Sequence, residues 1–183
     1  RVSGIDGDVD IDFSYKDYTE TITPKKYAEV SKWIQDENGW WYRYGNGEYP
    51  AGGWEKIKGI WYLFDSDGYL LTGWQKISGK WYYMNENGAM QTGWVDDDTY
   101  YTNADGVMQI GWAYLEDPDD TKKDDDEVKP GDDDEDHHWY YFQSSGKKYV
   151  PSLGGAKYKQ YKIDGTYYCF DENGAMQTGW VDM

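Results

Sequence analysis

The sequence predicts an all-β protein in which short β-hairpins repeat along the chain and stack into a solenoid. Three observations support this prediction: Gly-Trp dipeptides recur about every 20 residues, a Trp-Tyr cluster follows seven residues after the tryptophan, and a turn glycine follows seven residues after that. A fixed period of this length is typical of repeat architectures. The dipeptides are Gly53-Trp54, Gly73-Trp74, Gly93-Trp94, Gly111-Trp112 and Gly179-Trp180.

Each repeat has the pattern of one β-hairpin. In the clearest repeat, residues 74–77 are predicted as a first strand, Ser78-Gly79 as a turn and residues 80–85 as an aromatic return strand. Asn87-Gly88 then predicts the turn that leads to the next repeat. Because an isolated two-stranded hairpin is only marginally stable in water, each hairpin has to bury its aromatic face against a neighbour. About six repeats can be recognised.

Two segments interrupt the repeats and divide the chain. Residues 1–30 are predicted to be a linker or the tail of a preceding domain, and apolar residues alternate with polar ones from Val9 to Tyr15 in the pattern of a strand. Residues 31–115 and 137–183 carry the repeats. Residues 116–136 contain 13 acidic and 3 basic residues where a hairpin turn belongs, so this acidic insertion is predicted to be a disordered hairpin tip.

Composition excludes several classes of protein. The net charge of −17, from 35 acidic and 18 basic residues, would repel a nucleic-acid backbone. The sequence has no apolar run of the length needed to cross a bilayer, about 18 residues, so no membrane insertion is expected. A single cysteine, Cys169, allows no intrachain disulfide. The first residue is Arg1 and not methionine, and we expect a piece of a larger protein.

The frame G-W-x(4)-G-x-W-Y-Y-x(4)-G-A-M-x-T-G-W resembles the cell-wall-binding repeats of Gram-positive surface proteins, the choline-binding type in particular. Residues 74–94 match it most closely, and the resemblance covers about residues 33–112 and 139–180. It implies hairpins stacked as a left-handed superhelix, with ligand held between consecutive hairpins. The walls of such a site are two tryptophans of one hairpin, an aromatic residue of the next and often a methionine. Relatives with a similar frame bind α-glucans or cell-surface carbohydrate.

Mapping that arrangement by position gives two candidate aromatic cages. One consists of Trp54, Trp61 and Tyr83, and the other of Trp74, Trp81 and Tyr101, with Met90 as its floor. A quaternary ammonium group cannot donate hydrogen bonds, and attraction to several electron-rich ring faces would hold it instead.

The remaining junctions lack a wall in the same mapping. The residues that replace a ring are Leu63 beside Trp33 and Trp40, Thr99 after Trp94, and Cys169 beside Trp112 and Trp139. Tyr62 and Tyr82 lie on the strand face opposite Trp61 and Trp81 and are predicted to pack in the interior. We therefore expect ligand near Met90 and none at Met176, where the chain ends soon after the repeat.

Catalytic and metal chemistry find little support in the sequence. Carboxylates are plentiful, but none stands in an evident pair for glycoside hydrolysis, and no Ser/His/Asp arrangement or nucleophile elbow is visible. His137-His138 lack ligands at zinc spacing. The alternating aspartates of residues 6–12 depart from a calcium loop at Ile11 and Asp17. No catalytic residue, metal or cofactor is predicted.

The predicted function is a non-catalytic, secreted or cell-wall-associated module that anchors a larger protein to the bacterial envelope. Its partner would be a wall polymer, a choline-substituted teichoic acid or glycan, bound by several weak sites together. Two alternatives stay open: a carbohydrate-binding module whose rings stack on sugars, and a structural spacer or adhesin stalk. A homo-oligomer also stays open, since another chain would supply the wall missing after Trp180.

Overall fold

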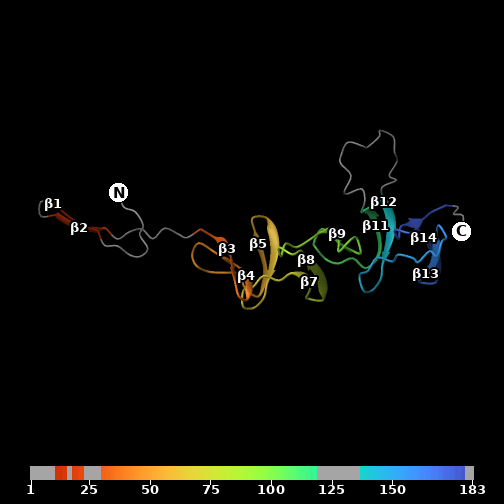
Figure 1. Cartoon of the computed structure of the whole chain (residues 1–183), viewed down its shortest axis with the longest axis horizontal. Helices are drawn as coiled ribbons and strands as arrows, with labels where there is room; N and C mark the ends of the chain where they lie inside the picture. The colour runs from red at the N-terminus through yellow and green to blue at the C-terminus, as the bar shows by residue number, and fades with distance from the viewer. Residues whose placement is uncertain (1–10, 16–17, 23–29, 119–136, 180–183) are drawn as a thin grey trace, which may run out of the picture.

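A computed structural model describes residues 11–15, 18–22, 30–118 and 137–179 of the chain. Within these residues there are fifteen β-strands and no helix, and the predicted all-β class is confirmed. From β3 onward the hairpins follow one another along the long axis of the molecule (Figure 1). The strands are β1 (Ile11–Tyr15), β2 (Tyr18–Ile22), β3 (Lys32–Asp36), β4 (Gly39–Arg43), β5 (Gly53–Ile57), β6 (Ile60–Phe64), β7 (Gly73–Ile77), β8 (Lys80–Met84), β9 (Gly93–Val95), β10 (Tyr100–Thr102), β11 (Gly111–Glu116), β12 (His137–Phe142), β13 (Lys159–Ile163), β14 (Thr166–Phe170) and β15 (Met176–Gln177).

The N-terminal segment contains the strand that its alternating pattern predicts. This strand is β1, and it pairs with β2 in antiparallel register, Ile11 opposite Ile22. Strand β2 was not expected from the sequence, and Val9 lies outside the described residues.

Tight turns close three of the repeat hairpins. Lys58-Gly59, Ser78-Gly79 and Asp164-Gly165 have positive φ at both positions, with values of 51° and 82° in Ser78-Gly79. This combination is typical of the two-residue type I′ turn, whose twist matches that of the strands. The predicted turn at Ser78-Gly79 is confirmed, and the return strand β8 ends at Met84, one residue before the predicted end.

A second kind of turn ends each repeat. In the β7–β8 repeat the side chain of Asn85 accepts hydrogen bonds from the backbone N–H groups of Asn87 and Ala89, both at 3.0 Å. Gly88 has a φ of +75°, and a Cβ at this position would lie 2.5 Å from a methyl carbon of Leu70 in the preceding repeat. Only glycine fits there, and the turn therefore packs tightly against the repeat before it.

After each of these turns, a single residue links its repeat to the preceding hairpin through its backbone. We call these the link residues: Leu70, Met90, Met108, Lys148 and Met176. The N–H of Met90, for example, donates to the carbonyl of Trp61 at 2.9 Å, and Met90 also forms a bridge with Met84 of its own repeat. Met176 makes the same connection from the two-residue strand β15, which lies between β12 and β14 in a five-stranded sheet.

The core is a thin column to which each hairpin contributes a few side chains. The last residue of each return strand from β6 to β14 is almost completely buried: Phe64, Met84, Thr102, Phe142 and Phe170 are 0–1% exposed. Aromatic rings of the preceding hairpin stack on this column, as Trp33 does on Phe64 and Trp112 on Phe170. Each hairpin thus buries aromatic surface against a neighbour, as predicted.

The acidic insertion enters the chain between β11 and β12. β11 runs to Glu116 and β12 begins at His137, so the insertion joins the two strands of one elongated hairpin. Residues 119–136, and Trp180 at the other end of the repeats, lie outside the described residues. The predicted disorder of the insertion and the predicted segment boundaries therefore remain predictions.

Candidate ligand sites between hairpins

Consecutive hairpins bring aromatic rings together at their junctions. A junction is the contact between one hairpin of the array and the next, and the five junctions are named A to E along the chain. They are A (β3–β4 with β5–β6), B (β5–β6 with β7–β8), C (β7–β8 with β9–β10), D (β9–β10 with β11–β12) and E (β11–β12 with β13–β14). Four positions meet at each junction: the first tryptophan, the residue at the second tryptophan position, a tyrosine of the following hairpin and the link residue.

Junction B contains three rings set at steep angles. The ring centroids of Trp54 and Trp61 lie 6.5 Å apart with an interplanar angle of 85°, and those of Trp54 and Tyr82 lie 5.0 Å apart at 69°. These rings line a hollow of about 320 Å³ together with Met90, Ala104 and Asp105. The side chain of Trp61 is 41% exposed, and such an exposed indole beside a hollow is typical of a ligand site.

The third wall at junction B is Tyr82 and not Tyr83. Within the β7–β8 hairpin Tyr83 lies opposite Trp74, and their ring centroids are 5.1 Å apart. Side chains alternate across a strand, so Tyr82 points from the other face, toward the preceding hairpin. The hairpins stack so that the face of one hairpin that carries the tryptophans lies against the opposite face of the next. The third wall predicted at Tyr83 is therefore displaced by one residue, to Tyr82.

Junction C follows the same rule. Trp74 contacts Tyr100, with ring centroids 4.9 Å apart, whereas the predicted third wall, Tyr101, pairs with Trp94 in its own hairpin at 5.3 Å. Met90 had been predicted as the floor of this cage, but it lines junction B. The link residue at junction C is Met108, whose N–H bonds to the carbonyl of Trp81 at 2.8 Å.

Junction A also has three rings, although the sequence analysis assigned it none beyond its two tryptophans. Trp33 and Tyr62 lie 4.9 Å apart, and together with Trp40 and Leu70 they line a hollow of about 300 Å³. The prediction had placed Leu63 in the position that Tyr62 occupies. Tyr62 packs against a core cluster, as predicted, and also lines this hollow. Tyr82 is partly buried as well and lines the hollow at junction B.

Junction E keeps its three rings despite the long insertion in its hairpin. The ring centroids of Trp112 and Trp139 lie 6.5 Å apart at 80°, close to the Trp54–Trp61 geometry at junction B. Tyr168, and not the predicted Cys169, forms the third wall at 4.6 Å from Trp112. Met176 pairs with Trp139 and holds the same place as Met90 at junction B, although the sequence predicts no ligand at Met176.

Junction D lacks the second tryptophan, as predicted from the sequence. Thr99 stands in that position, and the two remaining aromatic walls are Trp94 and Tyr140, whose ring centroids lie 5.0 Å apart. The link residue is Lys148, whose N–H donates to the carbonyl of Thr99 at 2.8 Å.

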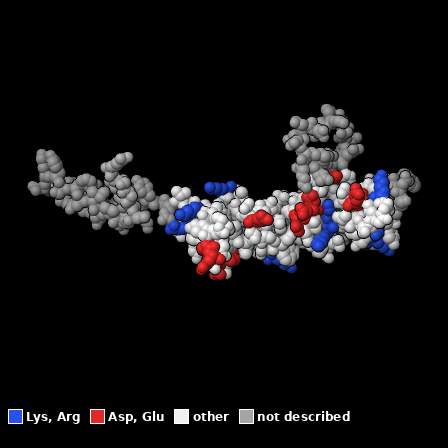
Figure 2. Space-filling view, viewed as in Figure 1, with Lys and Arg blue, Asp and Glu red and all other residues white. Residues whose placement is uncertain are grey.

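Charged groups border the cages. Glu86 lies at the rim of junction A and Asp105 at the rim of junction B. On the face shown in Figure 2, acidic side chains form separate clusters spread along the array. Two lysines stand across the hairpin from second tryptophans: Lys56 Nζ lies 5.5 Å from the Trp61 ring centroid and Lys76 Nζ lies 5.8 Å from that of Trp81.

The part of the chain that the structure describes shows neither a metal cluster nor a membrane-spanning helix. No group of three or more His, Cys, Asp or Glu side chains gathers there in a way that would hold a metal ion. Nor do the described residues include a helix long and apolar enough to cross a membrane. Burial raises the pKa of the Cys169 thiol, which favours a protonated, unreactive side chain.

The geometry defines the class of protein: a β-hairpin repeat array with recurrent aromatic sites for a small ligand. Residues 51–93 and 71–108 match the choline-binding repeat family, and residues 135–148 match the cell wall binding repeat family. Over residues 51–108 and 135–148 the chain therefore carries choline-binding and cell wall binding repeats.

Two solved structures from Streptococcus pneumoniae share the fold. Choline binding protein F aligns with a TM-score of 0.63 at 29% identity, over 93% of this chain and 53% of that one. CbpJ of strain TIGR4 aligns with a TM-score of 0.58 at 30% identity, over 82% of this chain and 47% of that one. The lysozyme of Streptococcus phage Cp-9 is 44% identical over 36 residues, which are 20% of this chain and 11% of the lysozyme. The chain therefore spans about half the length of the two solved relatives.

Proposed function

We propose that the chain is a non-catalytic module that binds the choline groups of a bacterial cell-wall polymer at junctions A, B, C and E. The observation that carries this proposal is the recurrence of a three-ring cage at junctions A, B and E, with an apolar link residue, leucine or methionine, beside it. Junction C repeats the tryptophan–tyrosine contact of these cages and has a methionine as its link residue. Trp54, Trp61, Trp74, Trp81 and Met90 keep the ligand-binding role that was predicted for them, whereas Tyr82 and Tyr100 replace Tyr83 and Tyr101.

The shape and charge of the cages favour a compact cation. Rings at 85° and 69° to one another, as at junction B, form a box and not the flat platform on which a sugar ring stacks. The negative faces of several rings attract a quaternary ammonium group, and a thioether such as that of Met90 adds a polarisable contact. The carboxylate of Asp105 at the rim adds long-range attraction for positive charge.

Several weak sites on one array would act together. A wall polymer carries its cationic groups at intervals, so once one site is filled, the next group is held near the next site at high effective concentration. A module of this kind anchors a larger protein to the envelope, and the length of the solved relatives supports a longer parent chain. In this proposal residues 31–115 and 137–183 are the binding repeats, residues 1–30 connect them to the rest of the protein, and the protein is located at the cell wall.

A calorimetric titration with choline tests the proposal when it is matched with an uncharged analogue of the same shape, 3,3-dimethyl-1-butanol. We expect choline and tetramethylammonium to bind in the millimolar range and the neutral analogue to bind at least about tenfold more weakly, because cation–π attraction is worth about 0.5–2 kcal/mol and more when rings act together. Equal binding of the neutral analogue, or no heat with choline, would contradict the proposal.

The same titration separates the alternatives. If the module bound carbohydrate, glucan oligosaccharides would give heat where choline gave none. Choline binding protein F has been solved with a peptidoglycan analogue, a tetrasaccharide-pentapeptide, which makes that fragment a useful second titrant. If the array were only a spacer, Trp61→Ala would leave retention on purified cell walls unchanged. The choline proposal instead predicts one site fewer in Trp61→Ala and elution of the wild-type protein from the walls by free choline.

A further inference from the structure

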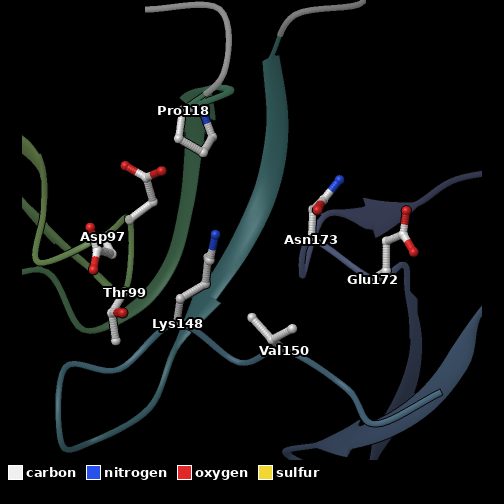
Figure 3. A pocket seen from close by; sticks show the side chains of 8 residues that line it. Asp97, Thr99, Pro118, Lys148, Val150, Glu172 and Asn173 are labelled. Carbon is white, nitrogen blue, oxygen red and sulfur yellow. The ribbon is translucent and has the colours of Figure 1, made fainter. Parts of the chain in front are cut away.

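Junction D repeats the plan of the other junctions with different chemistry. Its hollow of about 310 Å³ is similar in size to those at junctions A and B. In all three, the lining includes residues from the turn of the hairpin that follows the two hairpins at the junction. Figure 3 shows the hollow at junction D, lined by Asp97, Asp98, Thr99, Pro118, Lys148, Val150, Glu172 and Asn173.

The chain itself places a cation on the rings of this junction. Lys148 Nζ lies 4.8 Å from the ring centroid of Trp94 and 5.3 Å from that of Tyr140. These are the two aromatic walls that junction D retains, and both distances are within the range of about 6 Å for cation–π attraction. Lys148 is the link residue here, so its side chain starts from the position that Met90 and Met108 hold at junctions B and C.

Carboxylates line the hollow beside the lysine, and hydrogen bonds hold the two aromatic walls in place. In Figure 3 the side chain of Lys148 extends into the space between the turn that carries Asp97 and the turn that carries Glu172. The hydroxyl of Tyr140 donates to Asp117 Oδ1 at 2.6 Å, and the indole N–H of Trp94 donates to the Glu116 carbonyl at 2.9 Å. The end of β11 thus fixes both aromatic walls.

Burial distinguishes this junction from its equivalents. Tyr140 is only 1% exposed, whereas the tyrosines at the same position in junctions A, B, C and E are all partly exposed: Tyr62, Tyr82, Tyr100 and Tyr168. At junction D the tyrosine belongs to a core cluster with Phe142 and Ala175, and the lysine side chain lies over its ring.

We propose that Lys148 is a built-in ligand: its ammonium group occupies the cation position of junction D, so that this junction excludes choline and is held together without it. This inference rests on the proposed function, since it assumes that choline occupies the equivalent position at the other junctions. It predicts an array with four choline sites and one permanently closed junction between the third and the last of them. The two hairpins at that junction, β9–β10 and β11–β12, then keep their mutual packing when choline is absent.

Three variants test the proposal by counting sites in choline titrations. Thr99→Trp restores the second tryptophan but keeps the lysine, and we expect the wild-type number of sites. Thr99→Trp with Lys148→Met restores both missing features, and we expect one additional site. Lys148→Met alone should melt at a lower temperature than wild type without choline. A full additional site in Thr99→Trp alone, or an unchanged melting temperature in Lys148→Met, would overturn the proposal.

A measurement on the wild-type protein covers the case in which a variant fails to fold. Protons beside the face of an aromatic ring are shifted upfield, so the Hε signals of Lys148, assigned with Lys148→Arg, should lie upfield of those of the other lysines and should not move when choline is added. Signals at ordinary lysine positions would overturn the proposal. If wild type bound no choline, the proposed function would fail, but the upfield shift would still show whether the lysine occupies the rings.

Discussion

Junctions B and D share a backbone plan and differ in the side chains that face the ligand position. Both have a link residue bonded to the preceding hairpin, Met90 to Trp61 at 2.9 Å and Lys148 to Thr99 at 2.8 Å, and both enclose about 310–320 Å³. Two exchanges separate them, tryptophan for threonine and methionine for lysine. The scaffold of turns and link bonds is therefore independent of the ligand chemistry, and a repeat can lose its site while it keeps its place in the array.

The largest expected effect comes from exchanging the first tryptophan of each junction. Trp94 packs against three rings, those of Tyr101, Tyr140 and Phe142, at 5.0–5.8 Å, and we expect Trp94→Ala to lower the free energy of unfolding by about 3–5 kcal/mol. The number of choline sites should not change, because junction D holds none. Urea unfolding and choline titration of the same sample measure both quantities.

Trp54→Ala is the matched control at junction B. Trp54 contacts two rings and faces a hollow, so its removal should cost less stability, about 2 kcal/mol, and should remove one choline site. The comparison between the junctions is wrong if Trp94→Ala loses a choline site, or if Trp54→Ala keeps the wild-type number.

A second pair of variants tests the scaffold that the junctions share. Gly106 has a φ of +79°, and a Cβ there would lie 2.5 Å from the Met90 sulfur, whereas Gly79 has a φ of +82° and open space around it. Gly79→Ala should cost about 1 kcal/mol for the left-handed backbone alone. Gly106→Ala should cost about 1–3 kcal/mol more and should also weaken choline binding at junction B, because Met90 has to move. Equal losses of stability in the two variants would show that the turn does not press on the link residue.

Much of the fold could be predicted from the sequence because hairpin geometry is local. The Ser78-Gly79 turn, the period and the glycine turns depend on a few adjacent residues, and the structure confirms them. The third wall of each cage could not be placed in the same way, since it depends on how one hairpin lies on the next. In the pair Tyr82-Tyr83 both residues are aromatic, and only stacking between hairpins decides which of them faces backward.

Two other features were within reach of the sequence but were missed. Gly146-Lys147-Lys148 aligns with Gly88-Ala89-Met90, so a lysine in place of the methionine was visible before its contact with Trp94 was known. Junction E was underrated because Cys169, and not Tyr168, was predicted as its third wall. The 26 residues that separate Trp112 from Trp139 leave the hairpin intact. In the folded hairpin the two strands simply continue side by side to Glu116 and His137, and the length of the insertion does not affect the spacing of the rings.

The choice between adjacent tyrosines is a direct test of the cage at junction B. Tyr82→Leu should weaken choline binding there between about 2-fold and 30-fold, equivalent to the 0.5–2 kcal/mol of one cation–π contact. Tyr83→Leu, the control on the other face of the same strand, should lower stability through its lost contact with Trp74 and leave affinity at junction B unchanged. A 5-fluorotryptophan spectrum, with the Trp61 signal assigned by Trp61→Phe, reports on this junction alone. The reverse pattern would restore the position predicted from the sequence.

The smallest effect concerns the lysines that stand over the second tryptophans. Lys76 Nζ lies 5.8 Å from the ring centroid of Trp81. A cation bound at junction C would therefore lie near the same ring as the lysine ammonium group. At junction E the corresponding residue is Tyr114, whose ring lies 5.4 Å from that of Trp139. We expect Lys76→Gln to tighten choline binding at junction C about twofold, because a like charge near the site is removed.

Salt and a matched charge change identify the cause of that effect. Lys80→Gln changes the net charge by the same amount. Lys80 directly precedes Trp81 in β8, so its side chain starts from the opposite face of the strand, and its effect should be smaller. At about 1 M salt, where the screening length falls to about 3 Å, the gain in Lys76→Gln should largely vanish. A gain that persists in high salt would mean that Lys76 acts by occupying space near the ring, and junction E would then differ from junction C in shape and not in charge.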